Sequence, residues 1–264
     1  MKEKILSNLT AECPWRDTLY WYDSTHSTNT LAKQLAKEGA SHGTVLIAGH
    51  QTDGRGRMGR TFQSPEGLGV YLSVILRPNC EPGQLMHLTC AAGVAMMDAV
   101  ESASGIRPQV KWINDLVIGD KKLGGILTEM SVRNGLVDYA VIGIGINCLQ
   151  KQEDFPAEIS QMATSLFLAA KKRISPDVLA AAMIEALWKL SADIFTRKGE
   201  IMDRYRENCI TLGKDIQVIR ENSVLPGKAV GMDNDGGLLV EYVDGSVKTV
   251  SSGEVSVRGM YGYV

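Results

Sequence analysis

The chain has 264 residues, of which 44% are hydrophobic and 22% charged, and its formal net charge is −2. This balance is typical of a globular protein and argues against a general nucleic-acid-binding protein, which would usually carry a strongly basic domain. Five cysteines without a Cys-x-x-Cys motif and four histidines without metal-ligand spacing predict reduced thiols and no zinc site. The charged start of the chain and the lack of an apolar run of about 20 residues predict a cytoplasmic protein without a membrane span.

Apolar patterns predict the elements of the first part of the chain. Strands are expected at residues 19–22, 45–48, 70–76, 110–118, 123–130 and 139–146. The strands at 110–118 and 123–130 form a predicted hairpin that turns at residues 119–121. Helices are expected from a cap at Thr28 or Asn29 to near Gly39, over residues 85–103, and from Pro176 to about residue 208.

The pattern changes after Leu212 and Gly213. Five short strands separated by turn residues are expected at residues 216–219, 227–232, 238–243, 247–250 and 254–257. The sequence therefore predicts an α+β protein with two domains, a larger one over residues 1–212 and a small β-barrel over residues 213–264.

A loop over residues 54–60, Gly-Arg-Gly-Arg-Met-Gly-Arg, alternates glycine with arginine in a chain of negative net charge. Arginine presents a charged planar fork to carboxylate and phosphate oxygens, and glycine lets a ligand approach the backbone. The loop also matches the Gly-x-Gly-x-x-Gly pattern of dinucleotide-binding folds, which requires a helix to follow. Residues 64–69, Ser-Pro-Glu-Gly-Leu-Gly, break helices, so the loop predicts an anion site without that fold.

The hairpin carries a second group of polar residues, Lys-Trp-Ile-Asn-Asp at 111–115 and Lys-Lys-Leu-Gly-Gly-Ile at 121–126. A turn at residues 119–120 would place Asp115 beside Gly124 and Asn114 beside Gly125. Glycines inside a strand usually mark the close approach of a ligand or of another backbone. Lys122 is expected to reach a bound anion there, whereas Lys121 is expected to be a solvated turn residue.

Two weaker signals accompany these motifs. Gly143 and Gly145 share one face of a strand that ends at Asn147, which is consistent with an open lane for a flat ligand or with close packing against a helix. Residues 23–29 gather hydroxyl and amide groups at a strand-to-helix turn, where a helix cap is the alternative explanation.

In their order and spacing, residues 51–60, 111–115, 121–127 and 143–147 resemble the biotin protein ligases, also called biotin–[acetyl-CoA carboxylase] ligases. The resemblance extends over residues 21–257. It implies a mixed-sheet catalytic domain similar to class II aminoacyl-tRNA synthetases and a small SH3-like C-terminal barrel. It also implies that biotin and ATP form biotinyl-5′-AMP, from which biotin passes to a lysine of a biotin carboxyl carrier protein.

The resemblance further implies roles for individual residues. Biotin is expected to contact Ser27, Thr28, Asn29, Gln51, Gly54, Arg55, Gly56, Arg57, Lys122 and Gly125. ATP is expected to contact Arg57, Arg60, Lys111, Asn114, Lys122 and Asn147. The expected catalytic residues are Lys122, Arg57, Asp115 and Lys111. Mg²⁺ is expected to arrive with ATP, and no metal is expected to be held by the protein alone.

The sequence departs from the family pattern at Ile113, where proline is common, and at Phe62, where tryptophan is common. The segment before residue 19 is expected to be too short for the DNA-binding helix-turn-helix module of some relatives, so no DNA binding is expected; a homodimer is plausible.

A lipoate ligase or an octanoyltransferase is the nearest alternative function, and Cys148 would then be a candidate thiol. A further alternative is an RNA-binding arginine-glycine segment. Such a segment would have repeated Arg-Gly units or stacking aromatic residues nearby, and the sequence has neither.

Overall fold

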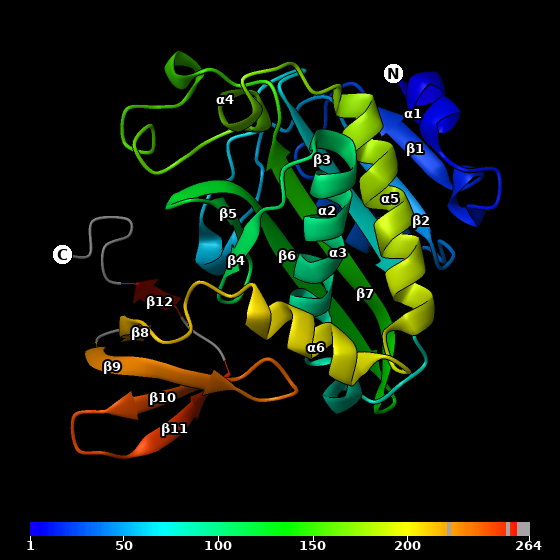
Figure 1. The fold of residues 1–264 in the computed structure, drawn as a ribbon. Helices are drawn as coiled ribbons and strands as arrows, with labels where there is room; N and C mark the ends of the chain where they lie inside the picture. The colour runs from blue at the N-terminus through cyan, green and yellow to red at the C-terminus, as the bar shows by residue number, and fades with distance from the viewer. Residues whose placement is uncertain (221–222, 252–253, 258–264) are drawn as a thin grey trace.

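The computed structural model describes residues 1–220, 223–251 and 254–257 (Figure 1). Its α-helices are α1 (Lys2–Asn8), α2 (Thr28–Lys37), α3 (Leu88–Ser104), α4 (Leu166–Ala170), α5 (Pro176–Asp193) and α6 (Lys198–Glu207). The strands of the first sheet are β1 (Leu19–Tyr22), β2 (Thr44–Ala48), β3 (Gly69–Leu76), β4 (Gln109–Lys111), β5 (Asp115–Ile118), β6 (Lys121–Arg133) and β7 (Leu136–Asn147). The strands of the second sheet are β8 (Asp215–Arg220), β9 (Ser223–Met232), β10 (Leu238–Tyr242), β11 (Val247–Val250) and β12 (Glu254–Val257).

The first sheet is mixed, as predicted. Its strand order is β1-β2-β3-β7-β6-β5-β4, with β1 and β2 parallel and the other neighbours antiparallel. The second sheet has the order β11-β10-β9-β8-β12, and all of its neighbours are antiparallel. The expected α+β architecture with a small C-terminal β-unit is therefore confirmed, whereas the domain boundary after residue 212 stays a prediction.

Alternation along the strands separates the core from the site. Val74 of β3 and Ile142 of β7 belong to the main core together with residues of α3 and α5, which cross one face of the first sheet (Figure 1). Their neighbours in sequence point to the opposite face because successive side chains of a strand alternate. There α2 packs with Ala32 and Ala36 over a smaller apolar cluster that includes Ile75. The strand positions beyond this cluster on the same face are Ser73, Gly143, Gly145 and Asn147.

The hairpin register differs by one residue from the expectation. Asp115 pairs with Gly125 and Leu116 with Gly124, after which the register shifts so that Val117 pairs with Lys122. The extra residue, Leu123, forms a bulge, and such an insertion cannot be inferred from the turn position alone. As a result Asp115 lies opposite Gly125.

Helix ends also differ in detail. The cap of α2 is Ser27, whose side chain accepts a hydrogen bond from the backbone N of Thr30, rather than Thr28 or Asn29. Helix α3 begins at Leu88, because residues Pro82–Leu85 form a separate 3-10 turn. Pro176 occupies the first turn of α5 as expected, and α1 has no counterpart in the sequence-based expectations.

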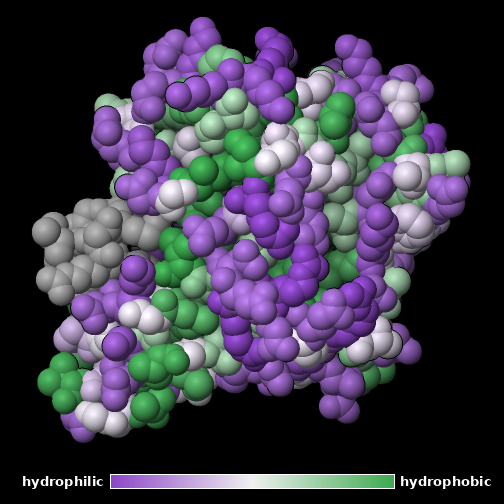
Figure 2. Space-filling view, viewed as in Figure 1, coloured by the Kyte–Doolittle hydropathy of each residue, from purple (hydrophilic) through white to green (hydrophobic). Residues whose placement is uncertain are grey.

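The second sheet contacts the first one close to the Lys-Trp-Ile-Asn-Asp segment. The indole Nε1 of Trp112 donates a hydrogen bond to the backbone O of Gly236 at 2.8 Å, and the backbone N of Trp112 donates to Thr211 Oγ1 at 2.9 Å. Figure 2 shows hydrophobic residues at the surface of the region that this sheet occupies. The exposed apolar side chains of its strands and turns include Val224, Leu225, Val230, Val243 and Val247.

Candidate active site

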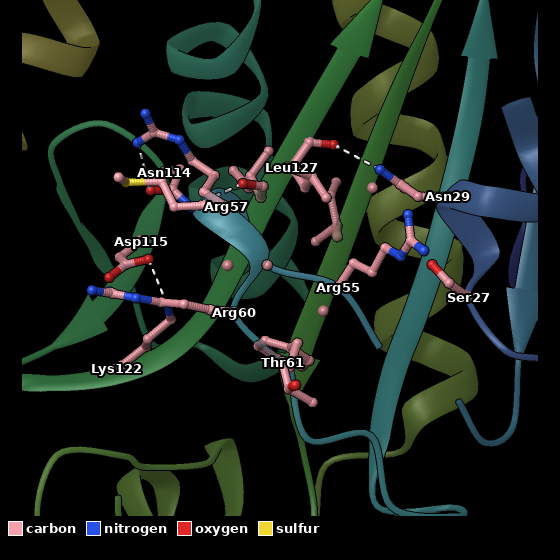
Figure 3. Close-up of a pocket in the computed structure, with 18 of the residues that line it drawn as sticks. Ser27, Asn29, Arg55, Arg57, Arg60, Thr61, Asn114, Asp115, Lys122 and Leu127 are labelled. Carbon is pink, nitrogen blue, oxygen red and sulfur yellow. Dashed lines mark hydrogen bonds and ion pairs between the residues drawn. The ribbon is translucent and has the colours of Figure 1, made fainter. Parts of the chain in front are cut away.

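A cavity of about 150 Å³, here called the first cavity, lies beside the glycine-bearing segments of β6 and β7 (Figure 3). The predicted site residues that line it are Ser27, Thr28, Asn29, Gln51, Arg55, Gly56, Arg57, Arg60, Lys111, Asn114, Asp115, Lys122 and Gly125. These residues come from segments far apart in the chain, namely the start of α2 with its cap, Gln51 after β2, the arginine-glycine loop and the β4–β6 segment. The fold therefore places them at one cavity, and their individual ligands stay predictions.

A rigid hydrogen-bond network forms one end of the first cavity. Gln51 Oε1 accepts hydrogen bonds from the backbone N of Thr28 at 2.9 Å and from Thr28 Oγ1 at 3.1 Å, and Gln51 Nε2 donates to Ser64 Oγ at 2.9 Å. The fully buried Ser73 Oγ lies 2.8 Å from Thr28 Oγ1 and 2.6 Å from Asn29 Oδ1. Each of the two carboxamides, of Gln51 and Asn29, is therefore held at both its oxygen and its nitrogen.

Asn29 is held on both sides of its carboxamide. Its Nδ2 donates to the backbone O of Leu127 at 3.2 Å and to Glu129 Oε2 at 3.0 Å, and Lys33 Nζ lies 2.6 Å from Glu129 Oε1. A Cβ atom at Gly143 would lie 1.8 Å from Asn29 Oδ1. Only glycine fits at position 143, so close packing is the reason for this residue.

The arginine-glycine loop is a compact turn. The backbone N of Gly56 donates to the backbone O of Arg60 at 2.7 Å, and Arg55 forms a β-bridge with Thr61. Gly54, the first residue of the loop, is not among the residues that line the first cavity, and a Cβ atom there would clash with the backbone O of Phe62. The arginine side chains of the loop thus project from a turn that close backbone packing supports.

Two polar contacts border the first cavity, one between the loop and the hairpin and one within the hairpin. Arg57 Nη1 donates to Asn114 Oδ1 at 3.3 Å, and Lys122 Nζ donates to Asp115 Oδ1 at 2.6 Å (Figure 3). Lys111, which is only 6% exposed, borders the same space. Among the described residues the lining has five cationic side chains and one carboxylate, Asp115. This excess of positive charge favours an anionic ligand.

Phe62 covers the remaining glycine of β7. A Cβ atom at Gly145 would lie 2.4 Å from the ring of Phe62, and a Cβ atom at Gly125 would lie 3.9 Å from it. The ring also makes an edge contact with Tyr71, with centroids 6.4 Å apart. The two glycines of β7 are therefore required by the close packing of Asn29 and Phe62, and both of them also line the first cavity.

A second cavity, of about 590 Å³, adjoins the first and shares Arg60, Lys111, Asp115 and Lys122 with it. Asn147 lines this second cavity. Its Nδ2 donates to the backbone O of Thr164 at 3.0 Å, and its Oδ1 accepts a hydrogen bond from Gln150 Nε2 at 3.2 Å. Asn147 thus stands near the cationic residues but outside the first cavity.

The opposite wall of the second cavity was not predicted from the sequence. It consists of residues between 154 and 163, which include the apolar side chains Phe155, Ile159 and Met162. Backbone hydrogen bonds from Lys122 to Met162 at 2.7 Å and from Thr164 to Lys122 at 2.8 Å attach this segment to β6. In the sequence this segment shows only irregularly spaced apolar residues, and such spacing indicates neither a helix nor a strand.

Cys148 does not have the environment of a catalytic thiol. It is fully buried, and burial raises its pKa to about 12, against the lowering effect of Arg173. Its Sγ lies 3.4 Å from the backbone O of Ile174. Because the thiolate is the nucleophilic form, this residue is unsuited to the acyl-accepting role of an octanoyltransferase.

Comparison with known proteins identifies the family. A model described as "Biotin/lipoate A/B protein ligase family" matches residues 21–147, and one described as "Biotin protein ligase C terminal domain" matches residues 211–258. The chain is 37% identical over 240 residues to the Bacillus subtilis "Bifunctional ligase/repressor BirA", covering 90% of this chain and 74% of that protein. The chain belongs to the biotin protein ligase family.

Two further members of the biotin protein ligase family agree with this assignment. The "Biotin--[acetyl-CoA-carboxylase] ligase" of Mycobacterium tuberculosis is 31% identical over 237 residues, covering 88% of this chain and 85% of that protein. The structure of the Aquifex aeolicus biotin protein ligase in complex with biotin and ATP matches with a TM-score of 0.74 and 30% identity, covering 91% of this chain and 98% of that chain. The protein is therefore an enzyme of the ligase class.

In the part of the chain that the structure describes, every helix is too short or too polar to cross a membrane.

Proposed function

We propose that this ligase activates biotin with ATP as biotinyl-5′-AMP and transfers biotin to a lysine of a biotin carboxyl carrier protein. The observation that carries the proposal is the meeting of Arg60, Lys111 and Lys122 at the boundary of two adjoining cavities, with Arg57 in the lining of the first. A reaction between a carboxylate and a triphosphate needs such an arrangement, because two anions must be held together and charge develops at phosphorus.

The first cavity is proposed to hold biotin. The network of Thr28, Asn29 and Gln51 offers fixed donors and acceptors to the polar ring, and the carboxylate tail would extend past Gly125 towards Lys122. The arginine-glycine loop would cover the tail and exclude water from the reactive anhydride.

The second cavity is proposed to hold the adenosine part of ATP. Asn147 and the apolar residues of the 154–163 wall offer a polar edge and a surface for a flat base. Lys111 and Arg60, which border both cavities, would hold the phosphates between the two substrates.

The chemistry follows from this placement in two steps. A carboxylate oxygen of biotin attacks the α-phosphorus, the bond to the bridging oxygen breaks, and pyrophosphate leaves. The amine of the carrier lysine then attacks the carbonyl carbon of the mixed anhydride, loses a proton, and releases AMP as the amide forms. Lys122 would stabilise the oxygens around phosphorus, and Asp115 would orient Lys122 through their ion pair.

The small number of carboxylates in the first cavity is consistent with a magnesium ion that arrives with ATP. Asp115, the one carboxylate of the first cavity among the described residues, is already paired with Lys122, and Mg²⁺ is commonly held by one or two carboxylates together with substrate phosphates. Such an ion would neutralise charge on the phosphates.

Exchange of labelled pyrophosphate into ATP tests the proposal. Exchange that depends on biotin and not on lipoate is expected from the wild-type protein. Exchange with lipoate alone would instead favour a lipoate ligase, and the absence of exchange with either acid would contradict an adenylating enzyme. A second measurement, transfer of labelled biotin to a purified carrier domain, tests the acceptor.

A further inference from the structure

Trp112 joins the first cavity to the second sheet. Its side chain is 4% exposed and belongs to the lining of the first cavity, together with its neighbour Lys111 and with Asn114. The indole Nε1 donates its hydrogen bond to the backbone O of Gly236, which lies in the turn between β9 and β10. A buried indole N–H needs an acceptor, because it has given up its hydrogen bond to water on folding. The acceptor of Trp112 therefore comes from the second sheet, although its side chain borders the site.

The turn over residues 233–237 is shaped to present this acceptor. Asp233 Oδ1 accepts hydrogen bonds from two backbone N atoms of the turn, the nearer being that of Gly237 at 2.8 Å. Gly236 has a φ of +90°, and a Cβ atom there would lie 3.0 Å from Cys90 Sγ of α3. Glycine thus allows the turn to take this backbone angle and to lie close against α3.

Helix α6 holds both the turn and the backbone next to Trp112. Arg206 Nε donates to the backbone O of Met232, just before the turn, at 3.0 Å. From the same helix Tyr205, whose side chain is fully buried, donates its hydroxyl hydrogen to the backbone O of Ile113 at 3.0 Å. The turn and the site segment are therefore fixed relative to one another through a common support.

The backbone around Trp112 depends on the linker between α6 and β8 as well. The backbone N of Trp112 donates to Thr211 Oγ1 at 2.9 Å, and the backbone N of Ile210 donates to the backbone O of Val110 at 2.9 Å. The same short segment carries Lys111, which borders both cavities. A displacement of Trp112 would shift Lys111, because the two residues share a peptide bond.

We propose that Trp112 is a positioning residue for the adenylation step, and that the turn over residues 233–237 keeps it in place through the hydrogen bond to Gly236. The proposal rests on the proposed function, in which Lys111 holds the phosphates of ATP. The second sheet then takes part in the first half-reaction, in which no carrier protein is present. A small misplacement of a group that contacts the reacting phosphate slows such a reaction strongly.

Biotin-dependent exchange of labelled pyrophosphate into ATP, measured without a carrier, tests the proposal. Trp112→Phe keeps an aromatic ring and removes the indole N–H, so the backbone O of Gly236 loses its donor. We expect kcat/KM for ATP to fall by roughly tenfold, because one hydrogen bond that orders the site segment is lost. KM for biotin should not change, because the hydrogen bonds between Thr28 and Gln51 at the other substrate do not involve Trp112.

Asp233→Ala tests the turn without altering either cavity lining. It removes the carboxylate that holds the turn, so it should reproduce the effect of Trp112→Phe on ATP and leave KM for biotin unchanged. Asp244→Ala is the matched control, since Asp244 Oδ1 accepts from the backbone N of Ser246 in the turn between β10 and β11, and it should retain the wild-type exchange rate. The double variant Trp112→Phe/Asp233→Ala should lose little more than either single variant, because both changes break one shared interaction. Fully additive losses would overturn the proposal.

Denaturant unfolding of the same variants separates positioning from stability. If the hydrogen bond only joined the two sheets, Trp112→Phe and Asp233→Ala would lower the free energy of unfolding and leave kcat/KM for ATP unchanged, which would overturn the proposal. Wild-type exchange combined with slower transfer of biotin to a carrier would also overturn it, because the second sheet would then serve carrier docking alone. Absence of biotin-dependent exchange in the wild-type protein would instead contradict the proposed function itself.

Discussion

Lys122 Nζ lies 2.6 Å from Asp115 Oδ1, and both side chains border the first and the second cavity. In the observed register Asp115 stands opposite Gly125 and Lys122 stands opposite Val117, so the two side chains lie on neighbouring strands. The pair therefore occupies the place where the two substrates are proposed to meet, and it is the natural first target for substitution.

Lys122→Ala should lose adenylate formation by roughly 10²–10³-fold while keeping its fold, because removal of one positioned donor to the developing charge typically costs this much. Lys121→Ala, one residue earlier on the same hairpin and outside both cavity linings, is the matched control and should retain the wild-type rate. Single-turnover release of pyrophosphate measures both. Equal rates for the two variants would contradict the role of Lys122.

Arg57→Lys tests the geometry of the loop as distinct from its charge. Lysine retains one positive charge but loses the planar fork, and Arg57 also donates to Asn114 Oδ1 at 3.3 Å. We expect Arg57→Lys to be slowed nearly as much as Arg57→Ala in adenylate formation. Arg133→Ala, an exposed arginine near the far end of β6, serves as control. Wild-type activity of Arg57→Lys would show that charge alone is sufficient.

Gly143→Ala should destabilise the protein and weaken biotin binding. The added Cβ atom would lie 1.8 Å from Asn29 Oδ1, and the Asn29 carboxamide is held by Leu127, Glu129 and Ser73. Such overpacking costs about 1–3 kcal/mol. Gly199→Ala on α6 meets no atom within 4 Å and should be neutral or stabilising. Urea unfolding and calorimetric titration with biotin compare the two, and a fully stable Gly143→Ala with normal biotin affinity would refute the packing argument.

His87 should make stability decrease at acidic pH. The residue is fully buried, its Nε2 donates to the backbone O of Ile194 at 2.9 Å, and burial lowers its pKa below the usual value. Between the lowered pKa and the ordinary value of about 6.5, the unfolded chain binds more protons than the folded protein, so stability falls as pH falls through this range. Denaturant unfolding between neutral and mildly acidic pH should give a shallower slope for His87→Gln than for the wild type. Parallel slopes would exclude His87 as a contributor.

The sequence was most informative where local rules apply. Alternation along β7 placed Gly143 and Gly145 on one face, and the arginine-glycine pattern identified the loop that borders the first cavity. The start of helix α2 was predicted to within one or two residues because hydroxyl residues at a strand-to-helix turn favour a cap there. These features depend on neighbours within a few residues, which the sequence displays directly.

Three features of the site could not be obtained in this way. The bulge at Leu123 moved the hairpin register by one residue, Phe62 and Asn29 filled the space above the β7 glycines, and residues 154–163 supplied the wall of the second cavity. Each of them depends on contacts between segments that are distant in the chain. The spacing of apolar and polar residues along the sequence does not reveal contacts between distant segments.

The sequence by itself indicated the strands of the first sheet in chain order, except that it joined β4 and β5 into one strand over residues 110–118, and it indicated the cationic residues that an anion requires. The tertiary structure alone decided that β4 and β5 form an antiparallel pair, that Lys122 contacts Asp115 and that Asn147 lines the second cavity together with residues 154–163. The physical reason is the same in each case: backbone preferences act locally, whereas the pairing of buried polar groups is set by which segments pack together.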